Sequence, residues 1–313
     1  MTRLQLNLVA NFAGQGWTAL MALAFVPLYI KFLGIEAYGL IGFYAMLQAA
    51  FQILDLGLSQ TMNREMARYS AFPEKYGEAR DIVRTLEIGY WAIGIIIGIV
   101  LLATSPFIAK HWIRSGSIPV ETIQRAVMIM GVVTALQWPL SFYDGGLMGL
   151  QRQVPINLVK IGVSTFGMFG AVFILWKISA TIIAYFVWQI VVSSLWVTLL
   201  MVFLWRSLPA ADRPPVFRPA LLRNISRFAV GMSGIAVSAI ILTQMDKIIL
   251  SKLLGLDMFG YYTLAGVASS VVPFLLVNPV FNALFPRFTS LVAVHDDSAI
   301  KLLYHQGTQL MAV

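Results

Sequence analysis

The chain has 313 residues, of which 59% are hydrophobic and only 12% are charged, with a formal net charge of +8. A soluble domain carries about 25% charged residues, so this composition indicates a protein embedded in a lipid bilayer. The absence of cysteine excludes disulfides and thiolate chemistry, and the three scattered histidines lack metal-ligand spacing, so we expect no metal and no cofactor. The basic residues lie between apolar stretches, which favours membrane topology over nucleic-acid binding.

Apolar stretches recur along the whole chain, and a helix needs about 20 such residues to cross a bilayer. The first stretch is too long for a signal peptide, whose apolar region has about 7–15 residues, so we expect it to be retained. A ninth stretch begins near Ile300 and is cut off at Val313. The complete spans are expected near residues 8–32, 38–58, 84–109, 123–150, 154–176, 179–205, 228–251 and 259–285.

Prolines interrupt several of these stretches. A proline inside a helix removes one backbone hydrogen bond and bends the helix, which membrane proteins tolerate where neighbouring groups satisfy the freed carbonyls. We expect such bends at Pro27 and Pro139. The eighth span is interrupted most, by Pro273, Pro279 and Pro286.

The distribution of basic residues predicts the orientation. If the N-terminus is inside, the tail and the even-numbered loops hold fifteen Lys and Arg and the odd-numbered loops hold seven, which accounts for all 22. Cytoplasmic loops are enriched in Lys and Arg, so the N-terminus is predicted to be cytoplasmic.

A nine-residue motif occurs twice. Lys31–Gly39 reads KFLGIEAYG and Lys252–Gly260 reads KLLGLDMFG, a spacing of 221 residues (31 to 252). This period is too long for a solenoid repeat. It is typical of transporters built from two homologous helical bundles related by an axis along the membrane normal. We therefore expect both copies on the same side of the membrane.

The two copies are separated by a linker at 206–227, which is rich in proline and arginine. Residues 1–222 are expected to form a six-helix bundle that ends in this linker, and residues 223–313 the first part of a second bundle. Twice the repeat spacing would reach about residue 442. We therefore expect the second bundle to be incomplete, and the 313-residue chain not to complement a strain that lacks the full-length protein.

The segments around both copies resemble one known family. Residues 26–43 (VPLYIKFLGIEAYGLIGF), Leu54–Ser59 and Asn63-Arg64 resemble the opening of Wzx-type polysaccharide-unit flippases, in the multidrug/oligosaccharidyl-lipid/polysaccharide exporter superfamily. Residues 246–255 (DKIILSKLLG) and 259–265 (FGYYTLA) are similar to the second half of such proteins.

The resemblance implies an all-α, multi-pass protein of the bacterial inner membrane, with two parallel-repeat bundles around a central cavity that opens to each side in turn. The implied cargo is an undecaprenyl-pyrophosphate-linked oligosaccharide, for O-antigen, capsule or exopolysaccharide assembly. Implied partners are the lipid bilayer and the polysaccharide polymerase and chain-length regulator of the pathway.

Three basic residues in or beside the spans are candidates for the substrate path. A charge at mid-bilayer costs roughly 2.5–3.5 kcal/mol on insertion scales, so it is a functional hypothesis by default. Arg64 and Arg287, which end the second and eighth spans, could contact a diphosphate or could anchor the topology. Lys160 could line the cavity or extend its amine to the interface.

Neutral polar residues form a second group. Asn11 and Gln15 are four apart and share one helix face, as do Asn278 and Asn282. These four and Asn63 could bind sugar hydroxyls or could hold helices together.

Three further residues are candidates for coupling or gating. Asp55 could bind a proton or cation, pair with a base, or cap a broken helix. Asp246 and Lys247 could form a gate that changes partners, or an ion pair with another helix.

Two other function classes remain open. A multidrug extruder of the same superfamily would favour an acidic, aromatic-lined cavity, and the basic excess argues against it. A membrane polymerase or glycosyltransferase would need a large outer loop or exposed carboxylates, and such an enzyme would not account for the 221-residue repeat. No nucleophile–base arrangement stands out, so we expect a non-enzyme.

Overall fold

The computed structural model describes residues 3–55, 57–69, 76–209, 213–219, 238, 241–269 and 297–312, and within these ranges the chain is an all-α membrane protein. Five helical segments are long and apolar enough to cross a membrane, and they confirm the first, third, fourth, fifth and sixth predicted spans. They are Val9–Leu33, Tyr76–Trp112, Val120–Gly149, Gln153–Lys177 and Ile182–Ser207.

The predicted second span, 38–58, is wrong in its extent. After α1 (Arg3–Leu33), Gly34 turns the chain with a positive φ of 84°, which glycine adopts without steric cost. The helix that follows, α2 (Ile35–Phe51), gives way to a 3-10 turn, η1 (Gln52–Asp55). Gly57, with φ 75°, then starts the separate helix α3 (Leu58–Tyr69). Arg64 therefore lies on α3 and not at the end of a spanning helix.

The next helices differ from the prediction at one proline. The helix α4 (Tyr76–Phe107) continues through a π-helical turn, η3 (Ile108–Trp112). The predicted span 123–150 is divided into α5 (Val120–Gln137) and α6 (Leu140–Gly149), with Pro139 at the start of α6. At the predicted bend, Trp138 and Pro139 interrupt the regular α-helix but keep helical dihedral angles, so 120–149 remains one span, whereas Pro27 lies inside the continuous helix α1.

The remaining described helices follow in order. They are α7 (Gln153–Lys177), α8 (Ile182–Ser207), two shorter helices at 241–253 and 256–269, and α11 (Asp297–Ala312). The helix 241–253 lies in the predicted seventh span, and 256–269 covers the first half of the eighth. The rest of the eighth span, with Pro273, Pro279 and Pro286, lies outside the described residues.

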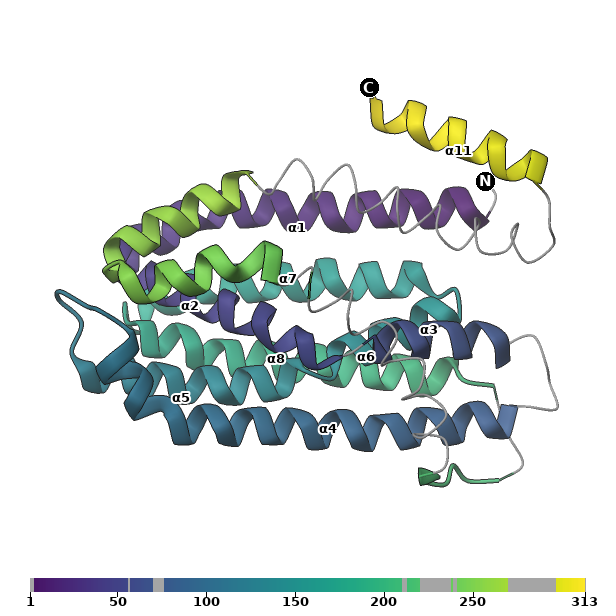
Figure 1. Ribbon diagram of the computed structural model, residues 1–313, viewed down its shortest axis with the longest axis horizontal. Helices are drawn as coiled ribbons and strands as arrows, with labels where there is room; N and C mark the ends of the chain where they lie inside the picture. Colours follow the sequence, from purple (N-terminus) through teal and green to yellow (C-terminus); the bar gives the residue numbers. More distant parts are fainter. Residues whose placement is uncertain are drawn as a thin grey trace.

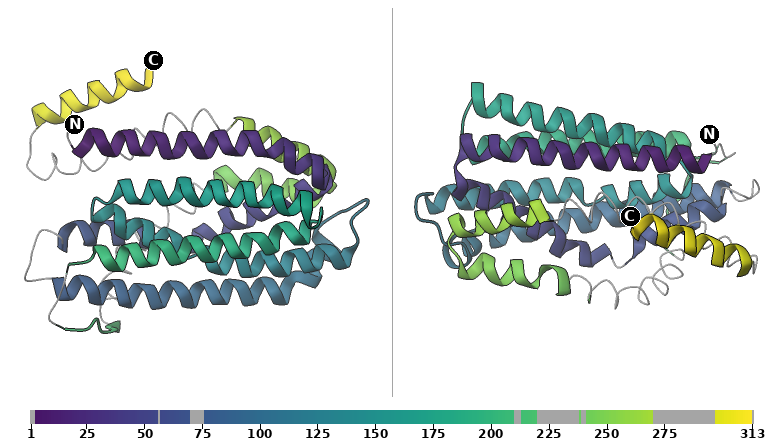
Figure 2. Two further views of the ribbon diagram at one scale, coloured as in Figure 1. Left: turned by 180° about the vertical axis from the view of Figure 1, so that it is seen from behind. Right: turned by 90° about the horizontal axis from the view of Figure 1, so that it is seen from above.

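Figures 1 and 2 show a bundle of nearly parallel helices, in which α4 packs on α5, α5 on α8, α8 on α7 and α7 on α1, while α3 packs on α6. Two clusters of buried hydrophobic residues fill it. One joins α1, α2, α5 and the start of α8 near the C-terminal end of α1, and it includes Leu256 and Phe259. The other joins α3, α4, α6 and the end of α8 near the opposite end.

One side of α4 faces outward with a purely apolar surface. Ile95, Ile96 and Ile99 are 54%, 59% and 58% exposed, whereas Ile97 on the same helix is buried. An exposed apolar stripe of this kind is stable where lipid covers it. The long apolar run of α4 therefore presents one face to its neighbours and the other to the bilayer.

The two copies of the motif lie at the same end of the bundle and pack on each other. A Cβ atom on Gly39 would lie 2.2 Å from the carbonyl oxygen of Leu256, and a Cβ atom on Gly260 would lie 2.5 Å from the carbonyl oxygen of Ile35. With the 221-residue spacing, Gly39 corresponds to Gly260 and Ile35 to Leu256. The two contacts are therefore equivalent under exchange of the copies.

A third contact lies on the two-fold axis that relates the two copies. A Cβ atom on Gly42 would meet the Thr263 side chain at 2.2 Å, and Thr263 is the residue that corresponds to Gly42. Reciprocal contacts of this kind are the signature of a two-fold relation. The residues in contact are separated by about 221 positions all along the two helices. Helix α2 and the helix 256–269 therefore run in the same direction, and the local two-fold axis is parallel to them.

Helix packing that depends on glycine gives the first test. A Cβ atom on Gly145 of α6 would lie 2.5 Å from the Ser59 carbonyl oxygen of α3, so Gly145→Ala should destabilise the bundle by about 1–3 kcal/mol through overpacking. The thermal midpoint of the purified protein in detergent should fall. In Gly162→Ala, the matched control on α7, nothing lies within 4 Å of the added Cβ, so the midpoint should stay or rise slightly. An equal fall in both variants would contradict close α3–α6 packing.

Candidate functional site

Asn11 lies in a closed polar cluster between α1 and α7. Its amide donates to Gln153 Oε1 at 3.0 Å, and Asn157 Nδ2 donates to Asn11 Oδ1 at 2.7 Å. Asn11 is only 3% exposed, so its polar atoms are used between helices and are not offered to a cavity. Gln15, one turn further, is also buried, and within the described part of the chain its Oε1 has no hydrogen-bond partner.

Asp55 holds the break between α2 and α3. Its Oδ2 accepts hydrogen bonds from Ser59 Oγ at 2.7 Å and from the Ser59 amide at 3.3 Å, which caps the first turn of α3. Its Oδ1 accepts from Tyr90 Oη on α4 and, at 3.4 Å, from Ser141 Oγ on α6. Of the three predicted roles of Asp55, this geometry provides the helix cap.

Arg64 lies on the exposed side of α3. Its guanidinium forms an ion pair with Glu65 at 2.7 Å, and its side chain is 54% exposed, whereas that of Glu65 is only 10% exposed. Arg68 is 4.0 Å from the same carboxylate and is 62% exposed. Asn63 is half-buried, and its carbonyl oxygen lies against Gly149 of α6. Glu65 thus holds two mobile cations at the end of the bundle opposite the motif.

Lys160 is half-buried on α7, and its charge acts on Asp144 of α6. Asp144 has a buried Oδ1 atom without a hydrogen-bond partner among the described residues. The sequence analysis missed Asp144 and also Glu87 of α4. Both are carboxylates inside predicted spans, which is the signal that could have identified them.

Glu87 is 4% exposed and is satisfied by three donors from three helices. Tyr143 Oη donates at 2.8 Å, Trp205 Nε1 at 3.0 Å and the Arg84 guanidinium at 3.1 Å. A buried carboxylate with this many donors fixes the positions of α4, α6 and α8 relative to one another.

Asp246 and Lys247 lie on the helix 241–253. Asp246 is exposed and accepts a hydrogen bond from Tyr262 Oη on the helix 256–269. The described contact of Asp246 therefore ties two neighbouring helices of the second repeat. The remaining candidates, Arg287, Asn278 and Asn282, lie outside the described residues, so their predicted roles in the substrate path stay predictions.

Two surface grooves contain none of the predicted site residues. The larger is apolar and lies between α7 and α8, where Leu158, Gly162 and Leu195 line it. The second is lined by Trp91, Ser194 and Met201 among others. Within the described ranges, no three His, Asp or Glu side chains are grouped to hold a metal ion.

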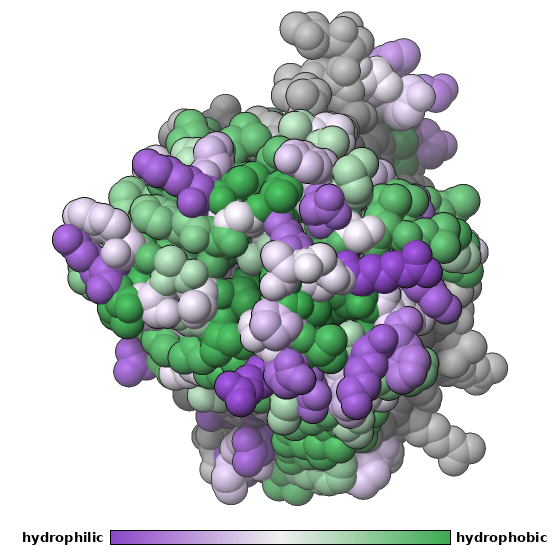
Figure 3. Space-filling view, turned by 90° about the vertical axis from the view of Figure 1, so that its left-hand side faces the viewer, coloured by the Kyte–Doolittle hydropathy of each residue, from purple (hydrophilic) through white to green (hydrophobic). Residues whose placement is uncertain are grey.

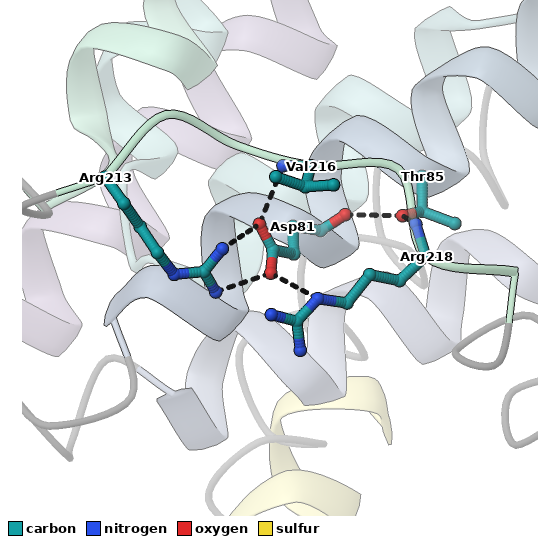
Figure 4. A network of polar contacts seen from close by, with 5 residues as sticks. All are labelled: Asp81, Thr85, Arg213, Val216 and Arg218. Carbon is teal, nitrogen blue, oxygen red and sulfur yellow. Dashed lines mark hydrogen bonds and ion pairs between the residues drawn. The ribbon is translucent and has the colours of Figure 1, made fainter.

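The described part of the linker is bound to α4 (Figure 4). Asp81, which is fully buried, accepts hydrogen bonds from the Arg213 guanidinium at 2.6 and 3.2 Å and from the Val216 amide at 2.8 Å. Arg218 forms an ion pair with the same carboxylate at 2.9 Å, and its amide donates to Thr85 Oγ1 at 3.0 Å. One carboxylate thus fastens residues 213–218 to the first bundle.

Replacement of this carboxylate tests the attachment. Asp81→Ala should release residues 213–218 and increase chymotrypsin cleavage after Phe217 several-fold, because hydrogen bonds to charged groups contribute about 1.5–3 kcal/mol and solvent weakens the exposed arginine pairs. Cleavage would be measured in inverted membrane vesicles, in which the protease reaches the face that was cytoplasmic. The control is Glu78→Ala, an exposed acid one turn earlier on α4. Equal cleavage in both variants would show that Asp81 does not hold the linker.

Comparison with known proteins adds the family. No curated protein and no solved structure matches the chain. One family, described as polysaccharide biosynthesis protein, matches residues 5–292, which is most of the sequence. The match agrees with the resemblance carried by residues 26–43 and 246–265, with the apolar helices and with the repeated motif. The chain therefore belongs to the polysaccharide biosynthesis protein family.

Proposed function

We propose that the protein is a flippase that moves undecaprenyl-pyrophosphate-linked oligosaccharide units across the bacterial inner membrane for O-antigen, capsule or exopolysaccharide synthesis. The reciprocal packing of Gly39 on Leu256 and of Gly260 on Ile35 carries this proposal. One class of transporters that open to each side in turn is built from two parallel bundles related by an axis along the membrane normal. The local two-fold relation of the repeats supports such an axis.

The charge distribution supports an orientation. Helix α3, the start of α4 and residues 213–219 lie at the end of the bundle opposite the motif (Figure 1), and they carry Arg64, Arg80, Arg84, Arg213 and Arg218. Under the positive-inside rule this end is cytoplasmic, together with the N-terminus. The motif end is then periplasmic. Since the two copies of the motif are packed together there, we infer that this arrangement is closed toward the periplasm.

The cargo has a diphosphate that must exchange its hydration for cationic contacts on entering the protein. Arg64 is the most suitable described residue, because it is more than half exposed and is held at the cytoplasmic end by Glu65. A diphosphate could displace Glu65 from Arg64, and Lys160 is a second cation deeper in the bundle. The polyprenyl chain needs no polar path, since it remains soluble in the bilayer.

This function requires binding and movement without bond formation, so we assign no enzymatic step. The sugar unit would be delivered to a polymerase and a chain-length regulator, which are the expected partners of the pathway. Gln15, Asn63, Asn278 and Asn282 remain proposed contacts for the sugar, whereas Asn11 is better assigned to helix packing.

Arg64 provides the test. In cells that carry the full-length protein, Arg64→Ala should lower surface polysaccharide several-fold with unchanged protein in the membrane, and Arg64→Lys should restore part of it, because the charge returns without the bidentate geometry. Arg68→Ala, on the same helix and beside the same glutamate, is the matched control and should retain transport. Normal polysaccharide in Arg64→Ala would reduce Arg64 to a topology anchor.

A further inference from the structure

The loop between α4 and α5, residues 113–119, is organised by a single carboxylate from the first copy of the motif. Glu36 accepts hydrogen bonds from Ser115 Oγ and the Gly116 amide, both at 2.6 Å. It also accepts from the Ser117 amide at 3.1 Å and from the Ser117 hydroxyl. Four donors on three consecutive residues give the loop a defined shape against the first turn of α2.

The same loop, with the π-helical turn before it, binds the second copy of the motif. The Leu256 amide donates to the Arg114 carbonyl oxygen at 2.9 Å, so that Arg114 and Gly255 form an isolated parallel bridge. Trp112 Nε1 donates to Ser251 Oγ at 3.1 Å. The Lys252 amine lies 5.3 Å from the centre of the Trp112 indole ring, within cation–π range.

These two sets of contacts differ in kind. The bonds to Glu36 join parts of the first bundle, so they can persist when the bundles move. The bonds to Ser251 and Leu256 join this part of the first bundle to the second repeat, and they must break if the loop stays with Glu36 while the two copies separate. The loop also breaks the two-fold symmetry, because Asp257, which corresponds to Glu36, is exposed to solvent.

We propose that residues 112–118 are a latch that holds the two copies of the motif together, and that Glu36 is the residue that positions it. The proposal rests on the proposed function, since only a transporter that opens at this end needs a releasable contact there. Figure 3 looks onto this end of the bundle, where hydrophilic side chains lie among hydrophobic ones.

The latch lies over the glycine contacts between α2 and the helix 256–269. With the latch closed, Thr263 lies against Gly42, three residues beyond the end of each motif copy. With the latch open, water and solutes should reach position 263 from the motif end. The accessibility of this position therefore reports the state of the latch without reference to any cargo.

The experiment uses the absence of cysteine, which makes a single Thr263→Cys substitution the only thiol of the 313-residue chain. The labelling rate by a membrane-impermeant maleimide in spheroplasts would be measured. Glu36→Gln should raise the rate at least fivefold, because the amide cannot accept all four hydrogen bonds. Asp257→Asn, the corresponding change in the second copy, is the matched control and should leave the rate unchanged.

A second variant guards against a folding defect. Trp112→Phe keeps Glu36 and its donors, removes the hydrogen bond to Ser251 and weakens the cation–π contact with Lys252, and it should also raise the labelling rate. Unchanged labelling in both Glu36→Gln and Trp112→Phe would overturn the latch, as would an equal rise in Asp257→Asn. If labelling changes as expected while the same variants leave surface polysaccharide unaffected, the latch stands and the proposed cargo is wrong.

Discussion

Close approach of helix backbones at glycine is the interaction on which this structure depends. Lipid tails are as apolar as the side chains that face them, so helices in a bilayer gain little from the hydrophobic effect and associate through packing and hydrogen bonds. Gly145 and Gly149 bring α6 against the carbonyl oxygens of α3, and Gly94 brings α4 against Ala135 of α5. Gly39 and Gly260 allow the same close approach between the two copies of the motif. Close packing at glycine therefore holds the helices of the bundle together and also joins the two copies of the motif.

The polar groups complete this arrangement, since three carboxylates accept hydrogen bonds from donors on other elements. Asp55 joins α3 to α4, Glu87 joins α4 to α6 and α8, and Asp81 fastens the linker to α4. A buried carboxylate without such donors would be costly in a low-dielectric interior. These three carboxylates therefore act first as structural ties, whereas Asp144, with one unpartnered oxygen, differs from them.

The candidate site could be predicted only in part. Arg64 and Lys160 were identified because a charge near a span is rare, and Asp55 because it interrupts an apolar run. Asn11 was chosen for its spacing from Gln15, yet its partner is Asn157, which is 146 residues away. The role of Glu36 could not be predicted, because its donors, Ser115 to Ser117, lie in a loop whose approach to α2 depends on the packing of α4 and α5.

The sequence by itself determined the class of protein, five of the membrane-spanning segments and the repeated motif. Length and hydropathy are local properties, and a bilayer admits few structures other than helices. The tertiary structure decided where the second predicted span breaks, at Gly57, because a break is stable only where a group such as Asp55 satisfies the freed backbone groups. It alone decided that the two motif copies touch in a two-fold manner, since that contact joins residues more than 200 positions apart and requires all the intervening helices to be in place.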